Sequence, residues 1–205
     1  MLKVVLVIIV AMLIVGMLTG GIHLYRVGQK NKKEMSLYLN KEIKYDNKLE
    51  KVLVVYYSLS GNTKYIAQSI AKQTNADVFE IETLDVIKPN LSFYFKIKKQ
   101  LNSRKYPEIK SKTPDFSKYD IVFVGFPVWW YTIATPGLSF LQQADFMGKK
   151  VVPFSTQGSN YGSFFTDFKK NAKNAQILDG MSFNNMSKEY NNAVNNKIND
   201  WLNKL

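Results

Sequence analysis

The sequence has 205 residues, no cysteine, one histidine, and 28 basic against 16 acidic residues, which gives a formal charge of +12. Without cysteine the chain cannot form disulfides, thiolate nucleophiles or Cys-ligated metal sites, and the single histidine, His23, cannot build a catalytic triad or a histidine-rich metal site. The length leaves room for one globular domain behind a hydrophobic N-terminal stretch and a polar connector.

The N-terminal stretch is long enough to cross a bilayer. No charged residue interrupts the 22 positions from Val4 to Tyr25, which are dominated by Val, Ile, Leu and Met. As a helix this run would reach about 33 Å. A cleaved signal peptide is the alternative, but its apolar core would be about 7–15 residues long and an A-x-A cleavage site would follow. We therefore expect residues 1–25 to be one transmembrane helix that is retained as an anchor.

Basic residues are concentrated after this stretch. Only Lys3 precedes it, and four basic residues follow closely, namely Arg26, Lys30, Lys32 and Lys33. The positive-inside rule then places the C-terminal side in the cytoplasm. We expect a single-pass protein of the cell membrane with its soluble domain in the cytoplasm. Residues 26–50 show no sustained apolar period and are expected to form a polar, partly helical linker without chemistry of its own.

The remaining residues, 51–205, alternate between strand and helix patterns. The short apolar segments with strand character are 51–57, 78–81, 121–126, 151–155 and 176–178. The segments with helical character are 63–74, 136–143, 163–171 and 187–204. Strands without polar alternation, interleaved with helices, indicate an α/β domain whose parallel sheet is covered on both faces.

In such sheets, ligands bind beyond the carboxyl ends of the strands, so the loops at those ends are the candidate site. The first loop consists of Ser58, Leu59, Ser60, Gly61, Asn62 and Thr63. It opens directly into a helix, where free backbone N–H groups and the helix dipole favour a phosphate. It has neither a Gly-Lys-Ser/Thr ending nor a G-x-G-x-x-G pattern, so a terminal monophosphate fits best. An ordinary helix cap would also explain any one of these residues.

Two further loops complete this edge of the predicted sheet. The second consists of Pro127, Val128, Trp129, Trp130 and Tyr131, and the third of Ser155, Thr156, Gln157 and Gly158, with Ser159 and Asn160 after it. The flat aromatic faces of the second loop suit a planar ring, although paired aromatics seen alone more often belong to core or surface packing. The third loop offers small polar groups and a glycine, which could approach the edge of a ring closely.

Together, the S-x-S-G-N-T motif of the first loop and the P-x-W-W motif of the second resemble the flavodoxin family, particularly its bacterial flavodoxin-like branch. The resemblance covers residues 51–205. It implies a flavodoxin-like doubly wound five-stranded parallel sheet, FMN as the cofactor, and flavin redox chemistry. By the same resemblance, Ser58, Ser60, Asn62 and Thr63 would hold the phosphate, the second loop would flank the isoalloxazine ring, and the third would bind its pyrimidine side.

The leading functional hypothesis is an FMN-dependent oxidoreductase that moves electrons from NAD(P)H to a quinone or another acceptor at the membrane. A membrane-tethered electron-transfer flavodoxin without its own turnover and an FMN-free scaffold are the alternatives. Many carrier flavodoxins are strongly acidic, whereas residues 52–205 hold 19 basic and 12 acidic residues. The charge therefore weakens the carrier hypothesis. The sequence offers no candidate side chain for acid–base catalysis and no metal site.

The charge of the domain is concentrated in residues 88–112, which hold eight basic residues and one acidic residue, Glu108. Phe93, Tyr94 and Phe95 lie among them. Basic residues mixed with aromatics on a helix suit a surface of anionic lipid, where each Lys or Arg contributes about 1 kcal/mol. We expect this segment to contact the membrane, and we expect no nucleic-acid partner. A solvated basic segment with buried aromatics is the alternative.

Overall fold

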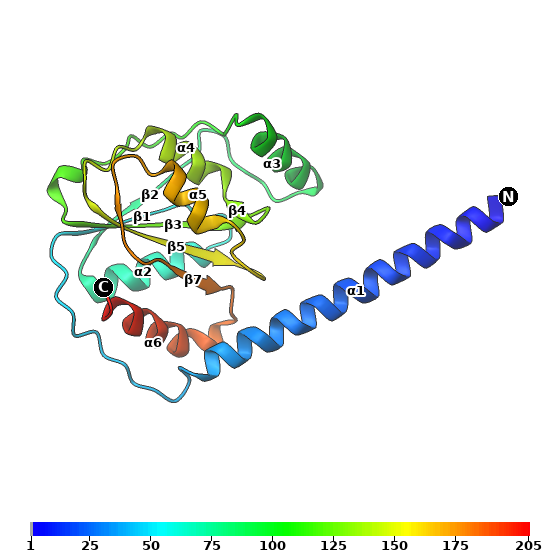
Figure 1. The fold of residues 1–205 in the computed structure, drawn as a ribbon, viewed down its shortest axis with the longest axis horizontal. Coiled ribbons are helices and arrows are strands. Elements are labelled where there is room, and N and C mark those ends of the chain that lie inside the picture. The colour runs from blue at the N-terminus through cyan, green and yellow to red at the C-terminus, as the bar shows by residue number, and fades with distance from the viewer. Residues whose placement is uncertain (1) are drawn as a thin grey trace.

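The computed structural model describes residues 2–205, which form a long N-terminal helix and one α/β domain (Figure 1). The helices are α1 (Leu2–Ser36), α2 (Asn62–Thr74), α3 (Leu91–Ser103), α4 (Thr135–Gln143), α5 (Phe164–Asn171) and α6 (Asn191–Leu202). The strands are β1 (Val52–Tyr56), β2 (Asp77–Glu80), β3 (Ile121–Trp129), β4 (Thr132–Ile133), β5 (Lys150–Gln157), β6 (Gln176–Ile177) and β7 (Met181–Asn184). Short 3-10 turns lie at Phe116–Lys118 and Lys188–Tyr190.

The sheet has the order β2-β1-β3-β5-β6, and all of these neighbours are parallel. Strand β7 also pairs with β5 in parallel, and β4 forms an antiparallel hairpin with β3. Because β6 and β7 pair with successive parts of β5, they occupy one strand position. The order is then 2-1-3-4-5, one of the two common doubly wound orders. The prediction of a doubly wound, five-stranded parallel sheet is confirmed.

The fifth strand is split into β6 and β7 opposite a proline of β5. The Leu178 N–H donates to the Val151 carbonyl at 2.9 Å, so Val151 directs its backbone groups toward this edge. Backbone groups alternate in direction along a strand, so Pro153 faces the same edge. Pro153 has no N–H to donate, and it lies between the residues that pair with β6 and those that pair with β7. The sequence pattern predicts only the first part of this strand.

The side chains of the sheet divide into two cores, one on each face. On one face, Val52 and Val54 pack with residues of α2 and α6, including Trp201. On the other, Leu53 and Val55 pack with residues of α4 and α5. Figure 1 shows α2 and α6 on one side of the sheet and α4 and α5 on the other. The alternation explains why β1 is buried on both sides and consists of aliphatic residues followed by Tyr56.

Helix α1 is one continuous helix whose N-terminal part lies outside the domain (Figure 1). Its large apolar side chains between Val4 and Tyr25 are exposed around the helix, each by 45% or more. Within residues 2–205, α1 is the one helix long and apolar enough to span a membrane. A helix that is apolar on every side and not buried in protein fits the interior of a bilayer.

Much of the predicted linker, between Met35 and Asn47, lies against α6. Met35, in the last turn of α1, is only 1% exposed. Beyond Ser36 the backbone is held by asparagine side chains of α6: Asn196 donates to the Tyr38 carbonyl at 3.0 Å and Asn199 to the Ile43 carbonyl at 2.7 Å. The segment is thus partly helical, as expected, and it also contacts the domain directly. The assignment of residues 26–50 as a separate linker stays a prediction.

Candidate functional site

A pocket of about 500 Å³ lies at the carboxyl edge of the sheet, where the three predicted loops meet. Its volume falls in the range of about 300–1,000 Å³ that is usual for small-molecule sites. The predicted residues that line it are Leu59, Ser60, Asn62, Pro127, Val128, Trp129, Trp130, Tyr131, Thr156, Gln157 and Gly158. The structure therefore brings all three loops to one site.

The first loop presents an uncapped helix start to this pocket. Gly61 precedes α2 with φ of 90°, a left-handed conformation that glycine adopts without strain. Its N–H donates to Ser58 Oγ at 3.1 Å, and Asn62 Nδ2 donates to Ser60 Oγ at 3.2 Å. Among residues 2–205, no side chain caps α2. The first backbone N–H groups of the helix are thus left to bind an anion, which the helix dipole also favours.

Other predicted residues support the pocket from behind. Thr63 is 1% exposed, and its hydroxyl lies 2.7 Å from that of Thr156, which joins the first loop to the third. Ser155 is fully buried and donates to Ser182 Oγ at 2.9 Å. The predicted residues outside the pocket lining are Ser58, Gly61, Thr63 and Ser155. The side chain of Thr63 holds two loops together.

The second loop is a tight hairpin with an unusual turn. Strand β3 continues through Trp129, which pairs with Thr132 of β4, so Trp130 and Tyr131 form a two-residue turn. Their φ angles are 49° and 62°, both left-handed. Such turns favour Asn-Gly, and a left-handed residue with a side chain stores on the order of 1–3 kcal/mol of strain. The strain therefore lies in the wall of the pocket.

Contacts from two neighbouring segments hold this turn in place. Trp130 Nε1 donates to the Tyr94 carbonyl at 3.2 Å, and the Lys98 amine lies 4.6 Å from the centre of the Trp130 ring. On the other side, the Ser163 N–H donates to the Tyr131 carbonyl at 2.7 Å. Trp130 and Tyr131 nevertheless stay 44% and 61% exposed. The turn presents two aromatic side chains at the mouth of the pocket, and the ring of Trp130 is held by its own contacts.

Trp129 is fixed by edge-to-face contacts with two other rings. The ring of Phe93 lies 5.0 Å away at 84°, and that of Tyr57 lies 5.9 Å away at 89°. Burial raises the pKa of Tyr57 to about 12, so this side chain stays neutral at physiological pH. Both geometries are favourable for aromatic pairs. The indole of Trp129 is therefore held in one orientation at the pocket.

The pocket also contains residues that the sequence analysis did not assign to the site, namely Phe93, Tyr94, Ser159, Asn160 and Asn185. Ser159 and Asn160 extend the third predicted loop. Asn185 follows the second half of the split fifth strand, which the sequence did not reveal. Phe93 and Tyr94 were noted only as aromatics among basic residues, because no spacing rule places α3 beside the hairpin.

The pocket lining is uncharged. None of the described residues that line it is an Asp, Glu, Lys, Arg or His. Binding therefore depends on neutral donors and acceptors, the dipole of α2 and apolar contact. The combination of an anion site, aromatic side chains and small polar groups around one pocket defines a protein that binds a planar ring carrying a terminal phosphate.

Comparison with protein-family models identifies the family. The model described as Flavodoxin matches residues 51–205, and the chain belongs to this family. The match covers the whole α/β domain and leaves out α1. Family membership confirms the predicted resemblance and the prediction of FMN as the cofactor.

Three of the solved structures with a similar fold are bacterial flavoproteins. A candidate flavoprotein from Bacteroides eggerthii has 27% identity and a TM-score of 0.63, covering 75% of this chain and 96% of its own. One from Bacteroides uniformis has 25% identity and a TM-score of 0.64, covering 75% and 98%. A Lactobacillus acidophilus flavoprotein, solved in complex with FMN, has 24% identity and a TM-score of 0.59, covering 64% and 92%. The comparison with curated proteins found no match.

Proposed function

We propose that the chain is a membrane-tethered FMN-dependent oxidoreductase that moves electrons from NAD(P)H to a quinone or another acceptor. The observation that carries the proposal is the single pocket that joins the uncapped start of α2 to the strained aromatic hairpin. The similar Lactobacillus acidophilus flavoprotein binds FMN, which supports the same ligand here. When bound, FMN would supply the hydride and electron chemistry.

The residues of the chain would bind and orient the cofactor. Ser60, Asn62 and the first N–H groups of α2 would hold its phosphate. Trp129, Trp130 and Tyr131 would flank the ring and exclude water from one side of it, and Thr156, Gln157 and Gly158 would face its polar edge. Because no described lining residue is charged, these residues position the reactants and are not assigned any proton transfer.

The exposed rim of the pocket is compatible with two modes of electron transfer. Trp130 and Tyr131 present apolar faces to solvent at the mouth, which suits a second flat molecule such as a nicotinamide or a quinone. The same faces would suit docking on a redox protein, which is the carrier alternative. Measured turnover separates these two possibilities.

The position of α1 supports action at a membrane. Figure 1 shows α1 leaving the domain on the side to which β5 and β7 point, and α3 lies on that side as well. The pocket lies at the same ends of these strands, where Gln157 and Asn185 line it. The apolar run ends at Tyr25, and Asn31 is already buried against the domain. These residues are about 9 Å apart along a helix. The domain would therefore lie close to the lipid surface, with the pocket on the membrane side.

The proposal is tested with the full-length protein purified in detergent. We expect an FMN absorbance spectrum, bleaching of the flavin band on anaerobic addition of NADH or NADPH, and steady-state oxidation of that donor when a soluble quinone is added. A flavin that is bleached only by a chemical reductant would reject the oxidoreductase and favour the carrier. Failure to bind added FMN would reject both.

A further inference from the structure

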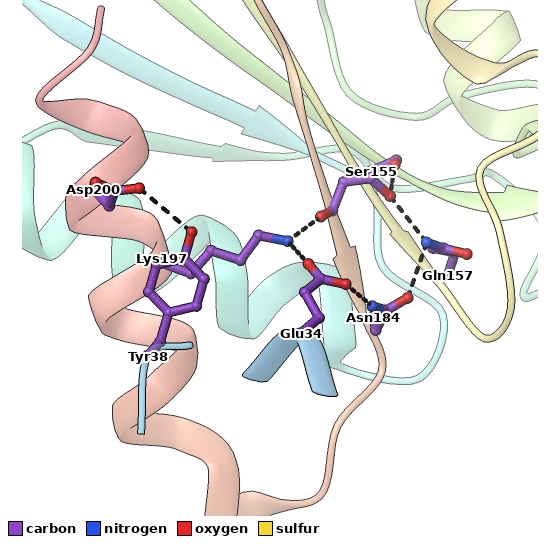
Figure 2. A network of polar contacts seen from close by, with 8 residues as sticks. Glu34, Tyr38, Ser155, Gln157, Asn184, Lys197 and Asp200 are labelled. Carbon is purple, nitrogen blue, oxygen red and sulfur yellow. Dashed lines mark hydrogen bonds and ion pairs between the residues drawn. The ribbon is translucent and has the colours of Figure 1, made fainter. Parts of the chain in front are cut away.

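A chain of hydrogen-bonded side chains connects α1 to the flavin pocket (Figure 2). It begins at Glu34, in the last turns of α1. Asn184, at the end of β7, donates from Nδ2 to Glu34 Oε2 at 2.8 Å. Gln157, at the end of β5, donates from Nε2 to Asn184 Oδ1 at 3.0 Å. Because Gln157 lines the pocket, three side chains lead from the anchor helix to the cofactor site.

A second branch fixes Glu34 from its other oxygen. Lys197 of α6 is 5% exposed and forms an ion pair with Glu34 Oε1. The Lys197 amine also donates to the Ser182 carbonyl at 2.7 Å. Ser182 Oγ in turn accepts from Gln157 Nε2 at 3.2 Å. A buried ammonium needs a charged partner, so Lys197 keeps the Glu34 carboxylate in this position.

The carboxylate gives the chain a fixed direction. An ionised carboxyl group can only accept hydrogen bonds, so Asn184 must turn its nitrogen toward Glu34 and its oxygen toward Gln157. Gln157 must then turn its nitrogen toward Asn184, which leaves Oε1 on the other side. Gln157 is 7% exposed, and its Oε1 is buried without a donor from any described residue. An unpartnered buried acceptor is costly, and a bound ligand can relieve that cost.

We propose that Glu34 is a positioning residue of the flavin site, which sets the Gln157 amide so that Oε1 accepts the ring N–H of the flavin's pyrimidine edge. This rests on the proposed binding of FMN. That edge carries one imide N–H between two carbonyl groups, so it needs an acceptor at its centre. The anchor helix thereby determines whether the oxygen or the nitrogen of the Gln157 amide faces the flavin.

Replacing Glu34 with Gln tests the direction of these hydrogen bonds, because the substitution hardly changes the size of the side chain. The oxygen of the new amide will face the Lys197 ammonium, so its nitrogen will face Asn184. Asn184 must then turn its oxygen toward position 34, and Gln157 must present its nitrogen to the pocket. A donor will then face the N–H of the flavin ring.

The experiment compares FMN with 3-methyl-FMN, which lacks this N–H, by quenching of flavin fluorescence with the full-length protein in detergent. The unmodified protein should bind FMN about 10-fold more tightly than 3-methyl-FMN, which is the effect of one hydrogen bond to a buried acceptor. E34Q should abolish this preference. N184L, which interrupts the chain but keeps the ion pair of Glu34 with Lys197, leaves Ser182 alone to orient the Gln157 amide and should reduce the preference. The control is Y38F, because Tyr38 donates to Asp200 in the same contact of the N-terminal segment with α6 but lies outside the chain (Figure 2).

The outcomes separate this proposal from the proposed function. Loss of the preference in E34Q and its reduction in N184L, with the full preference kept in Y38F, support the role of Glu34. If E34Q does not fold, N184L decides. FMN binding with the same preference in every variant overturns the role of Glu34 but leaves the flavin function intact. Equal binding of both flavins to the unmodified chain overturns the role of Gln157, and no binding of either flavin overturns the proposed function itself.

Discussion

Individual residues at the hairpin show how a strained conformation is maintained. Trp130 and Tyr131 are left-handed, and Gly162 packs directly against the Tyr131 backbone. A Cβ atom at position 162 would lie 2.1 Å from the Tyr131 carbonyl oxygen, where no side chain fits. Gly162 also has φ of 54°. The turn thus depends on a glycine outside the pocket lining.

Replacing Gly162 with alanine should therefore damage both stability and the flavin site. We expect a loss of about 3 kcal/mol of unfolding free energy, from left-handed strain together with the clash, and weaker FMN binding. Urea unfolding and flavin fluorescence measure the two effects. G148A is the control, since Gly148 has φ of 78° but open space around it, away from the pocket. It should cost about 1–2 kcal/mol and leave FMN affinity unchanged. Equal effects of the two variants on FMN affinity would contradict this role of Gly162.

The hydroxyl pair of Thr63 and Thr156 should contribute mainly to stability. T63V and T156V each leave a buried hydroxyl without its partner, and each should cost about 1–3 kcal/mol, whereas the double variant should cost less than their sum. Urea unfolding of the four proteins gives the coupling. In contrast, S60A together with N62A should lower FMN affinity with little change in stability, because these side chains are more exposed. Additive losses in the threonine cycle would show that the two hydroxyls do not interact.

At the scale of elements, sequence patterns predicted the helices and strands that are determined by local periodicity. Helix α2 begins one residue before the predicted segment, and its predicted apolar positions, Ile66, Ala67, Ile70 and Ala71, face the core. The loops of the site followed because parallel strands end at the same edge. These features depend only on residues that are close in sequence.

The elements that sequence did not reveal depend on contacts between distant segments. Strand β7 contains Ser182 and Asn184, whose polarity resembles a loop until their partners on β5 are known. The asparagine-rich sequence of α6 likewise looks like a solvated surface. In the structure, Asn196, Asn199 and Asn203 bind the backbone of residues 38–47. No periodicity encodes that pairing.

Because the N-terminal segment contacts α6, two truncated proteins should differ in stability. A chain that starts at residue 29 keeps Met35 and Tyr38 against the domain, whereas one that starts at residue 51 loses them together with the asparagine contacts. We expect the shorter chain to be less stable by about 2–4 kcal/mol, mostly from lost apolar burial. Urea unfolding of both chains measures the difference. Equal stabilities would mean that residues 29–50 contribute nothing to the fold.

At the scale of the whole molecule, exposed cations and aromatics gather on α3. Lys96, Lys98 and Lys99 are exposed and form no salt bridge with another described residue. Tyr94 and Phe95 are 64% and 80% exposed, whereas Phe93 turns into the pocket. The proposed lipid contact of residues 88–112 is consistent with this arrangement, because apolar rings and cations lie on one exposed helix.

The chain that starts at residue 29 tests this surface apart from the anchor. It should co-sediment with anionic vesicles at low salt and ignore neutral vesicles, and K96E/K98E/K99E should abolish binding. The control K72E/K118E/K150E makes the same change of charge at exposed lysines elsewhere and should retain most of the binding. Equal loss in both variants would indicate net charge alone, and binding to neither vesicle would remove the lipid contact.

The predicted orientation is tested with the complete chain in cells. Protease added to intact cells, or to spheroplasts of a bacterial host, should leave the domain undigested, because residues 26–205 are predicted to face the cytoplasm. Permeabilised cells provide the control for protease sensitivity. Digestion without permeabilisation would reverse the orientation, and a mature N-terminus beyond residue 25 would show that the anchor is cleaved.

The unbroken path of α1 from its apolar run to its buried end at Met35 has a kinetic consequence. A domain attached by a flexible linker can occupy many positions and orientations above the membrane, so it meets partners at many heights and angles. Here, in the proposed orientation, the domain can rotate and diffuse only together with α1. It therefore meets partners by two-dimensional diffusion, at one height above the lipid. Partners that share this plane would be met often, and those whose reactive groups lie at another height would be excluded by geometry alone.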